Sequence, residues 1–166
     1  MDTSRCINLK PHHFIDILGD VGRGRTNWHP VPGYRHALHS IARSLMENRD
    51  VRIRMEVGID DICEPCVHHV GETCNDARGH PFPGQPSGKM EWNLMLDRGW
   101  CSLLGLKQGQ ELTARDFCGL VARAVSLAAL KQIYPGQPVE LTQKRYEDLL
   151  AGLDIFCGGT GQHGAR

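Results

Sequence analysis

Three cysteines lie close together in the segment DDICEPCVHHVGETC, which covers residues 60–74. Two residues separate Cys63 from Cys66, so a tight turn lets both thiolates reach one metal centre, and Cys74 returns after seven more residues. Thiolates are soft ligands that suit zinc or an iron–sulfur cluster. The spacing therefore predicts a metal centre held by these three cysteines. The alternative is that they are unligated thiols in a loop.

The two candidate cofactors need different numbers of ligands. A closed zinc site takes four ligands in tetrahedral geometry. His68 and His69 are the nearest candidates for the fourth, but they follow Cys66 closely, and a solvated pair is the simpler interpretation. The second C-x2-C pair of a zinc ribbon is missing. A [4Fe–4S] cluster is larger and can be held by three cysteines with one iron left open. We therefore expect a [4Fe–4S] cluster, with Zn²⁺ as the alternative.

A second group of polar residues lies in KPHHFID, residues 10–16. Residues three or four positions apart face the same side of a helix, so His12 or His13 would pair with Asp16. A carboxylate beside an imidazole fixes its tautomer and raises its basicity. The pattern predicts proton transfer by these histidines, and the alternative is a surface histidine with a helix-capping role.

The rest of the chain must position these residues, and its pattern is mainly helical. Alternation of apolar and charged residues in VRIRMEV, residues 51–57, predicts the one clear strand. Apolar residues at helical spacing predict most of the remaining elements. Helices are expected from Pro11, from Tyr34 to about Asn48, over 89–104, from a Thr113–Asp116 capping box to Pro135, and after a Thr142 cap. We expect an α+β fold, predominantly helical, with one small β element.

The length of 166 residues is that of one ordinary domain and is enough to bury a core without a metal. We expect a single compact metal- or cluster-binding domain over residues 1–157 and a flexible tail over 158–166. A net charge of zero makes nucleic acid a poor partner. No apolar run is long enough for a membrane span, and the start lacks a secretory signal. The expected location is the cytoplasm, where seven cysteines serve as thiols or ligands.

Three stretches of this chain resemble the domain-of-unknown-function family 1284. They are PHHFIDILGDVGRG near the start, VGIDDICEPC before and within the cysteine segment, and LLGLKQG over residues 103–109. The resemblance covers about residues 7–118, and residues 119–157 look like a helical extension. It implies iron–sulfur or other metal binding and supplies no settled activity.

One position departs from the family pattern. Many members have a cysteine where this chain has Asp16, and that cysteine would be the natural fourth ligand. A carboxylate binds iron less tightly than a thiolate does. The resemblance therefore implies that Asp16 is a weak ligand that a substrate displaces, or a base beside the ligands.

These observations lead to an enzyme as the first hypothesis. Cys63, Cys66 and Cys74 would hold the cluster, whose open iron polarises a small-molecule substrate. His12 or His13 would move protons, and Asp16, Asp60 or Asp61 would orient the imidazole or ligate the metal. The reaction would be a non-redox lyase or hydrolase step, and removal of sulfur from a thiocarbonyl compound is one concrete form. The alternatives are a non-catalytic module with structural zinc and a small electron-transfer protein. The oligomeric state is open, with a homodimer as one option.

Overall fold

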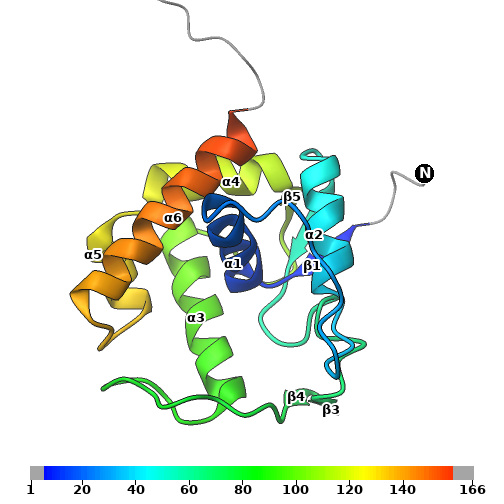
Figure 1. Cartoon of the computed structure of the whole chain (residues 1–166), viewed down its shortest axis with the longest axis vertical. Helices are drawn as coiled ribbons and strands as arrows, with labels where there is room; N and C mark the ends of the chain where they lie inside the picture. Colours follow the sequence, from blue (N-terminus) through cyan, green and yellow to red (C-terminus); the bar gives the residue numbers. More distant parts are fainter. Residues whose placement is uncertain (1–5, 159–166) are drawn as a thin grey trace, which may run out of the picture.

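The structure, a computed structural model, describes residues 6–158 of the chain. This part forms six helices and five short strands (Figure 1), so the predominantly helical α+β class is confirmed. The predicted tail lies, from residue 159 on, outside the described residues. The helices are α1 (Pro11–Gly22), α2 (Leu38–Glu47), α3 (Lys89–Leu104), α4 (Ala114–Ala124), α5 (Leu127–Ile133) and α6 (Val139–Cys157). The strands are β1 (Ile7–Leu9), β2 (Arg52–Met55), β3 (His69–Val70), β4 (Thr73–Cys74) and β5 (Glu111–Thr113).

The predicted strand is the centre of a three-stranded sheet in the order β1-β2-β5. Ile53 and Met55 of β2 are fully buried while the arginines between them are exposed, as the alternation predicted. Strand β1 runs parallel to β2 and β5 runs antiparallel to it. The carboxyl ends of two parallel strands meet at one edge of a sheet. The chain therefore leaves β1 into α1, and leaves β2 toward the cysteine segment, at the same edge.

Several helix boundaries differ from the expected ones. The helix expected from Tyr34 begins only at Leu38, so that start was wrong. The long helix expected before Pro135 is broken into α4 and α5, because Ser126 accepts a hydrogen bond from the Ala129 amide and starts a new helix. Thr142 does not cap the last helix, which begins at Val139. The cap at Thr113 is confirmed by its 3.0 Å hydrogen bond from the Asp116 amide.

Helix α1 begins at this sheet edge, and most of its residues are buried. Helix α6 packs along it (Figure 1). Phe14 of α1 stacks on Phe117 of α4, with ring centroids 4.8 Å apart. Glycines allow the two helix backbones to touch, since a Cβ atom on Gly152 would lie 1.8 Å from the Leu18 carbonyl oxygen. These contacts fix the position of α1, whose first turn carries the two histidines.

Within residues 6–158, no helix combines the length and the apolar character that crossing a lipid bilayer requires.

Candidate functional site

The sheet edge brings the start of α1 against the cysteine segment. The Asp61 amide donates to the Asn8 carbonyl oxygen at 3.0 Å. In return, the Asp61 carboxylate accepts from the Asn8 amide at 3.1 Å and from the Asn8 side chain at 3.2 Å. Both carboxylate oxygens of Asp61 are therefore occupied in fastening this segment to β1. Asp61 therefore holds the segment against β1, and its expected roles, orienting an imidazole or ligating a metal, stay predictions.

Asp60 connects the two segments through its buried carboxylate. Its Oδ2 accepts from the Lys10 amide at 2.9 Å and lies 2.8 Å from His13 Nδ1, and its Oδ1 accepts from the Cys63 amide at 3.0 Å. Burial alone would raise the pKa of Asp60, but His13, Lys10 and these hydrogen bonds outweigh it and hold that pKa well below its ordinary value. Asp60 is therefore an ionised carboxylate at neutral pH.

His13 has a defined tautomer because Asp60 lies against its Nδ1. Burial lowers the pKa of His13, and the opposing effect of Asp60 does not reverse the shift. The ring is therefore neutral at pH 7, and its Nδ1–H donates to the carboxylate. The lone pair then sits on Nε2, which has no hydrogen-bond partner among the described residues. A neutral imidazole oriented in this way can accept a proton from a substrate.

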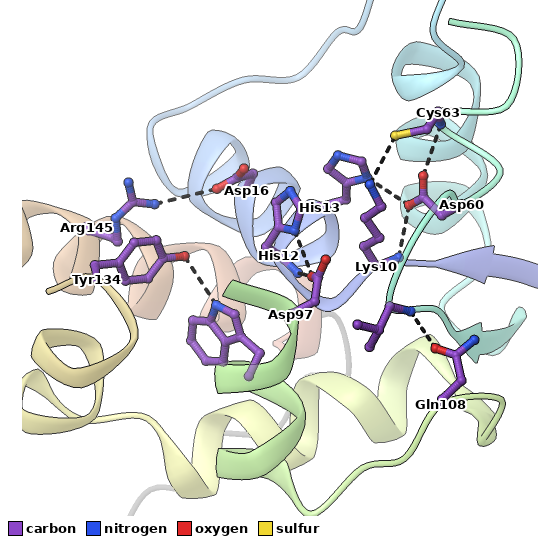
Figure 2. A network of polar contacts seen from close by, with 12 residues as sticks. Lys10, His12, His13, Asp16, Asp60, Cys63, Asp97, Gln108, Tyr134 and Arg145 are labelled. Atoms are coloured by element: carbon purple, nitrogen blue, oxygen red, sulfur yellow. Dashed lines mark hydrogen bonds and ion pairs between the residues drawn. The ribbon is translucent and has the colours of Figure 1, made fainter. Parts of the chain in front are cut away.

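Lys10 and Cys63 form the next contact of the site (Figure 2). Lys10 is fully buried, and its Nζ donates to Cys63 Sγ at 3.3 Å. Burial, followed by the nearby Asp60 charge, raises the pKa of the Cys63 thiol to about 12, against the opposing effect of Lys10. Ligand atoms of His13, Asp60 and Cys63 all lie within 4.8 Å of one another. His13 and Cys63 therefore share one site.

His12 has its own carboxylate, Asp97 of α3, which the sequence reasoning missed. Asp97 Oδ1 accepts from the His12 amide at 3.0 Å and lies 2.7 Å from His12 Nδ1. Asp97 is fully buried, and its Oδ2 has no hydrogen-bond partner within the described part of the chain. The two imidazole centroids are 4.4 Å apart. Two consecutive histidines thus each have Nδ1 held by a different buried carboxylate.

The position of Asp97 in the sequence could have indicated its role, because it lies on the apolar face of the expected helix over residues 89–104. The buried positions of α3 are Asn93, Leu96, Asp97, Trp100, Cys101 and Leu104, which follow helical spacing. A carboxylate on the apolar face of a helix needs a partner, because an unpaired buried charge is costly.

Asp16 does not join either histidine, so the expected pairing on α1 was wrong. Its carboxylate is about half exposed and lies 3.5 Å from Arg145 Nη1 of α6. Arg145 is positioned in turn over the ring of Tyr134, at 4.2 Å from the centroid. Figure 2 shows Asp16 directed toward Arg145 and away from Cys63. The structure does not bring Asp16 to the cysteine segment.

Cys66 and Cys74 are positioned by backbone hydrogen bonds. The Cys66 amide donates to the Cys63 carbonyl oxygen at 2.9 Å, which closes the turn between them. Strands β3 and β4 then form a hairpin in which Cys74 lies opposite His69. All three cysteines are free and partly buried. The turn therefore fixes the backbone between Cys63 and Cys66, and the hairpin fixes that of Cys74.

The adjacent histidines have other partners. His69 Nδ1 lies 3.0 Å from the Glu64 carbonyl oxygen and its Nε2 lies 2.6 Å from that of Gly71. Both ring nitrogens must donate to these carbonyls, and the Glu64 carbonyl raises the pKa of His69 accordingly. His68 Nδ1 lies 3.1 Å from the Asn75 side-chain oxygen. Its Nε2 lies 3.5 Å from Asp76 Oδ1. His69 therefore offers no free lone pair to a metal, and both ring nitrogens of His68 face oxygen atoms of neighbouring side chains.

The spacing of the thiols bears on which group they can hold. Among the described residues, His13, Asp60 and Cys63 form the only group of three or more such ligands within 4.8 Å of one another. One tetrahedral zinc ion with bonds of about 2.3 Å would hold its sulfurs only about 3.8 Å apart. The three cysteines are therefore not collected for a single zinc ion. Three thiols are nonetheless the kind of soft donor that an iron–sulfur cluster takes.

No protein-family model, curated protein or solved structure matches this chain. The resemblance to family 1284 stays a prediction, and the function must be argued from the site itself.

Proposed function

We propose that this protein binds a [4Fe–4S] cluster through Cys63, Cys66 and Cys74 and is a non-redox lyase or hydrolase that acts on a small molecule. The observation that carries the proposal is the contact between Cys63 and a set of polar groups that can move protons. Lys10 Nζ lies 3.3 Å from its sulfur, and the His13–Asp60 pair lies beside it.

Charge favours a cluster over a lone cation among His13, Asp60 and Cys63. A buried ammonium 3.3 Å from the sulfur would repel a divalent cation bound there. A cluster ligated by three thiolates carries net negative charge, so the same ammonium would stabilise it. Asp60 is also already engaged by three donors, which leaves it poorly placed to ligate a metal. We therefore assign Asp60 to orienting His13.

The residues of this chain supply proton transfer and binding. A bound cluster would supply an open iron, which acts as a Lewis acid toward a substrate oxygen or sulfur. His13 would take or give a proton through Nε2, with Asp60 fixing its tautomer. His12 would be a second proton carrier, fixed by Asp97. Removal of sulfur from a thiocarbonyl compound remains the concrete form of the reaction, in a reducing cytoplasm where the seven thiols stay reduced.

A structural zinc site is the second candidate, because the Cys63–Cys66 turn followed by a hairpin is an arrangement that zinc sites also use. It would require the hairpin to close around the ion. It predicts a colourless protein that loses stability on addition of a chelator.

Purification without oxygen separates the two candidates. Reconstitution with iron and sulfide should give a brown protein with about four irons and four sulfides per chain. Replacing Cys63, Cys66 or Cys74 one at a time with Ala should abolish loading. Cys6→Ser is the matched control, because Cys6 is also a partly buried free thiol but lies outside the segment. A protein that takes up only zinc under these conditions contradicts the proposal.

Activity is tested separately on the loaded protein. Sulfide release from a panel of thiocarbonyl compounds should require the cluster and fall by about 10²–10⁴-fold in His13→Gln, the range for loss of a general acid or base. His29→Ala is the control, because His29 is exposed. Equal rates in His13→Gln and the wild type would remove His13 from the mechanism.

A further inference from the structure

A second segment of the chain lies antiparallel against the cysteine segment. The Val67 amide donates to the Tyr34 carbonyl oxygen at 2.9 Å, and the Ala37 amide donates to the Ile62 carbonyl oxygen at 2.9 Å. These two bonds lie on either side of the Cys63–Cys66 turn. Because the two backbone segments run in opposite directions, the residues between Tyr34 and Ala37 lie opposite that turn. His36 is one of them.

His36 has an unused ring nitrogen in this position. Its Nδ1 is buried and has no hydrogen-bond partner among the described residues. A buried polar atom without a partner costs free energy, so it calls for a partner such as an ion. The His36 ring lies 5.6 Å from the ring of Tyr34, and the other side of Tyr34 is approached by the ring of His68 in the cysteine segment, at 5.1 Å. His36 is thus packed next to the cysteine segment through Tyr34.

The other candidates for a fourth ligand are already engaged. Both ring nitrogens of His69 bond carbonyl oxygens, and those of His68 lie 3.1 Å from the Asn75 side-chain oxygen and 3.5 Å from Asp76 Oδ1. Asp16 pairs with Arg145 on another side of α1. Of the histidines next to the cysteine segment, His36 is the one with a buried, unpartnered nitrogen and a backbone fastened to the Cys63–Cys66 turn on both sides.

We infer that His36 is the fourth protein ligand of the cluster proposed for Cys63, Cys66 and Cys74, an inference that rests on the proposed function. An imidazole is a less soft ligand for iron than a thiolate. His36 would therefore ligate the fourth iron in the resting protein and dissociate from it when a substrate binds. This replaces Asp16 as the weak ligand and keeps the site accessible to small molecules.

His39 is the natural competitor, which makes it the matched control. Its Nδ1 is also buried without a partner among residues 6–158. It lies in the first turn of α2, however, beyond the Ala37–Ile62 hydrogen bond that ends the paired segment. The backbone hydrogen bonds therefore place His36 within the paired segment and His39 outside it.

The test is pulsed electron paramagnetic resonance on the anaerobically loaded and reduced protein. Wild type labelled with ¹⁵N-histidine should show a histidine nitrogen coupled to the cluster. His36→Ala should lose this coupling and His39→Ala should keep it. His36→Cys should load fully, lack the nitrogen coupling and have a more negative midpoint potential, because a thiolate replaces a neutral imidazole. This variant keeps the test decisive if His36→Ala loads poorly.

The outcomes distinguish the inference from the proposed function. A wild type that takes up no cluster refutes the proposed function. A wild type that loads a cluster without any histidine coupling refutes only the assignment of His36. Coupling that survives in His36→Ala and His36→Cys but disappears in His39→Ala also refutes it. Coupling lost in the His36 variants alone supports it.

Discussion

The two halves of the candidate site are built in different ways. The polar network, which consists of Lys10, His12, His13, Asp60 and Asp97, is held by side-chain hydrogen bonds between groups that are buried or nearly so. The cysteine segment is held by backbone bonds of a turn and a two-residue hairpin, and it exposes Val67 and Val70. The network already holds both histidine Nδ1 atoms with carboxylates, whereas within residues 6–158 the three thiols of the segment have one hydrogen-bond partner, Lys10. The first half is therefore preformed, and the proposed cluster would add its contacts to the second.

The largest expected effect tests that contrast directly. Asp60→Ala removes the acceptor of the Lys10 amide, of His13 and of the Cys63 amide. Breaking a buried charged network by removing one partner costs about 3–5 kcal/mol. Urea unfolding of the metal-free protein at pH 7 should show this loss. Cys66→Ser, in the other half, should change the free energy of unfolding by less than about 1 kcal/mol. Similar losses in both variants would contradict the contrast.

A smaller loss is expected at Asp97. Asp97→Asn keeps the shape and one acceptor but places an amide N–H beside a buried imidazole, which should cost about 1–3 kcal/mol. The same change should release the Nδ1–H tautomer of His12, visible in its ¹⁵N chemical shifts. The tautomer of His13, which Asp60 holds, should stay unchanged. Unaltered shifts at His12 would show that Asp97 does not orient it.

The pH dependence of stability tests His13. Burial lowers its pKa below the value of about 6.5 in an unfolded chain, so the unfolded state takes up this proton first as pH falls. The stabilisation from neutral His13 is present above that pH and decreases below it. The difference in unfolding free energy between wild type and His13→Gln should therefore shrink from about pH 7.5 to about pH 5.5. His29→Ala, an exposed control, should keep the wild-type slope.

The smallest effect is expected at Asp16. Its ion pair with Arg145 is half exposed, and such pairs contribute little. Asp16→Ala should change stability by less than about 0.5 kcal/mol and should leave the iron content of the loaded protein unchanged. A clear loss of iron in this variant would restore Asp16 as a ligand and weaken the distinction between the two halves.

The sequence predicted the fold class and the central strand. It also pointed to residues of the candidate site, but not to the residues that hydrogen-bond them. Cysteine spacing and the His12–His13 pair depend on residues close in sequence, so both were visible. The partner of His12 is 85 residues away on another helix, and no local pattern connects them. Strands β1 and β5 have three residues each, too few to show an alternation. The expected pairing with Asp16 failed because both Nδ1 atoms turn toward carboxylates from other segments.

The close approach of Gly152 in α6 to the Leu18 carbonyl of α1 has a consequence for how the chain is made. Helix α1 leaves the ribosome early, yet the helix that covers it follows about 130 residues later. At about 5–20 residues per second, α1 would stay uncovered for on the order of ten seconds during synthesis. The part of α1 that α6 covers, at Leu18, lacks this cover during that interval. The contacts that hold α1, whose first turn carries the histidine pair, are therefore complete only when translation is nearly finished.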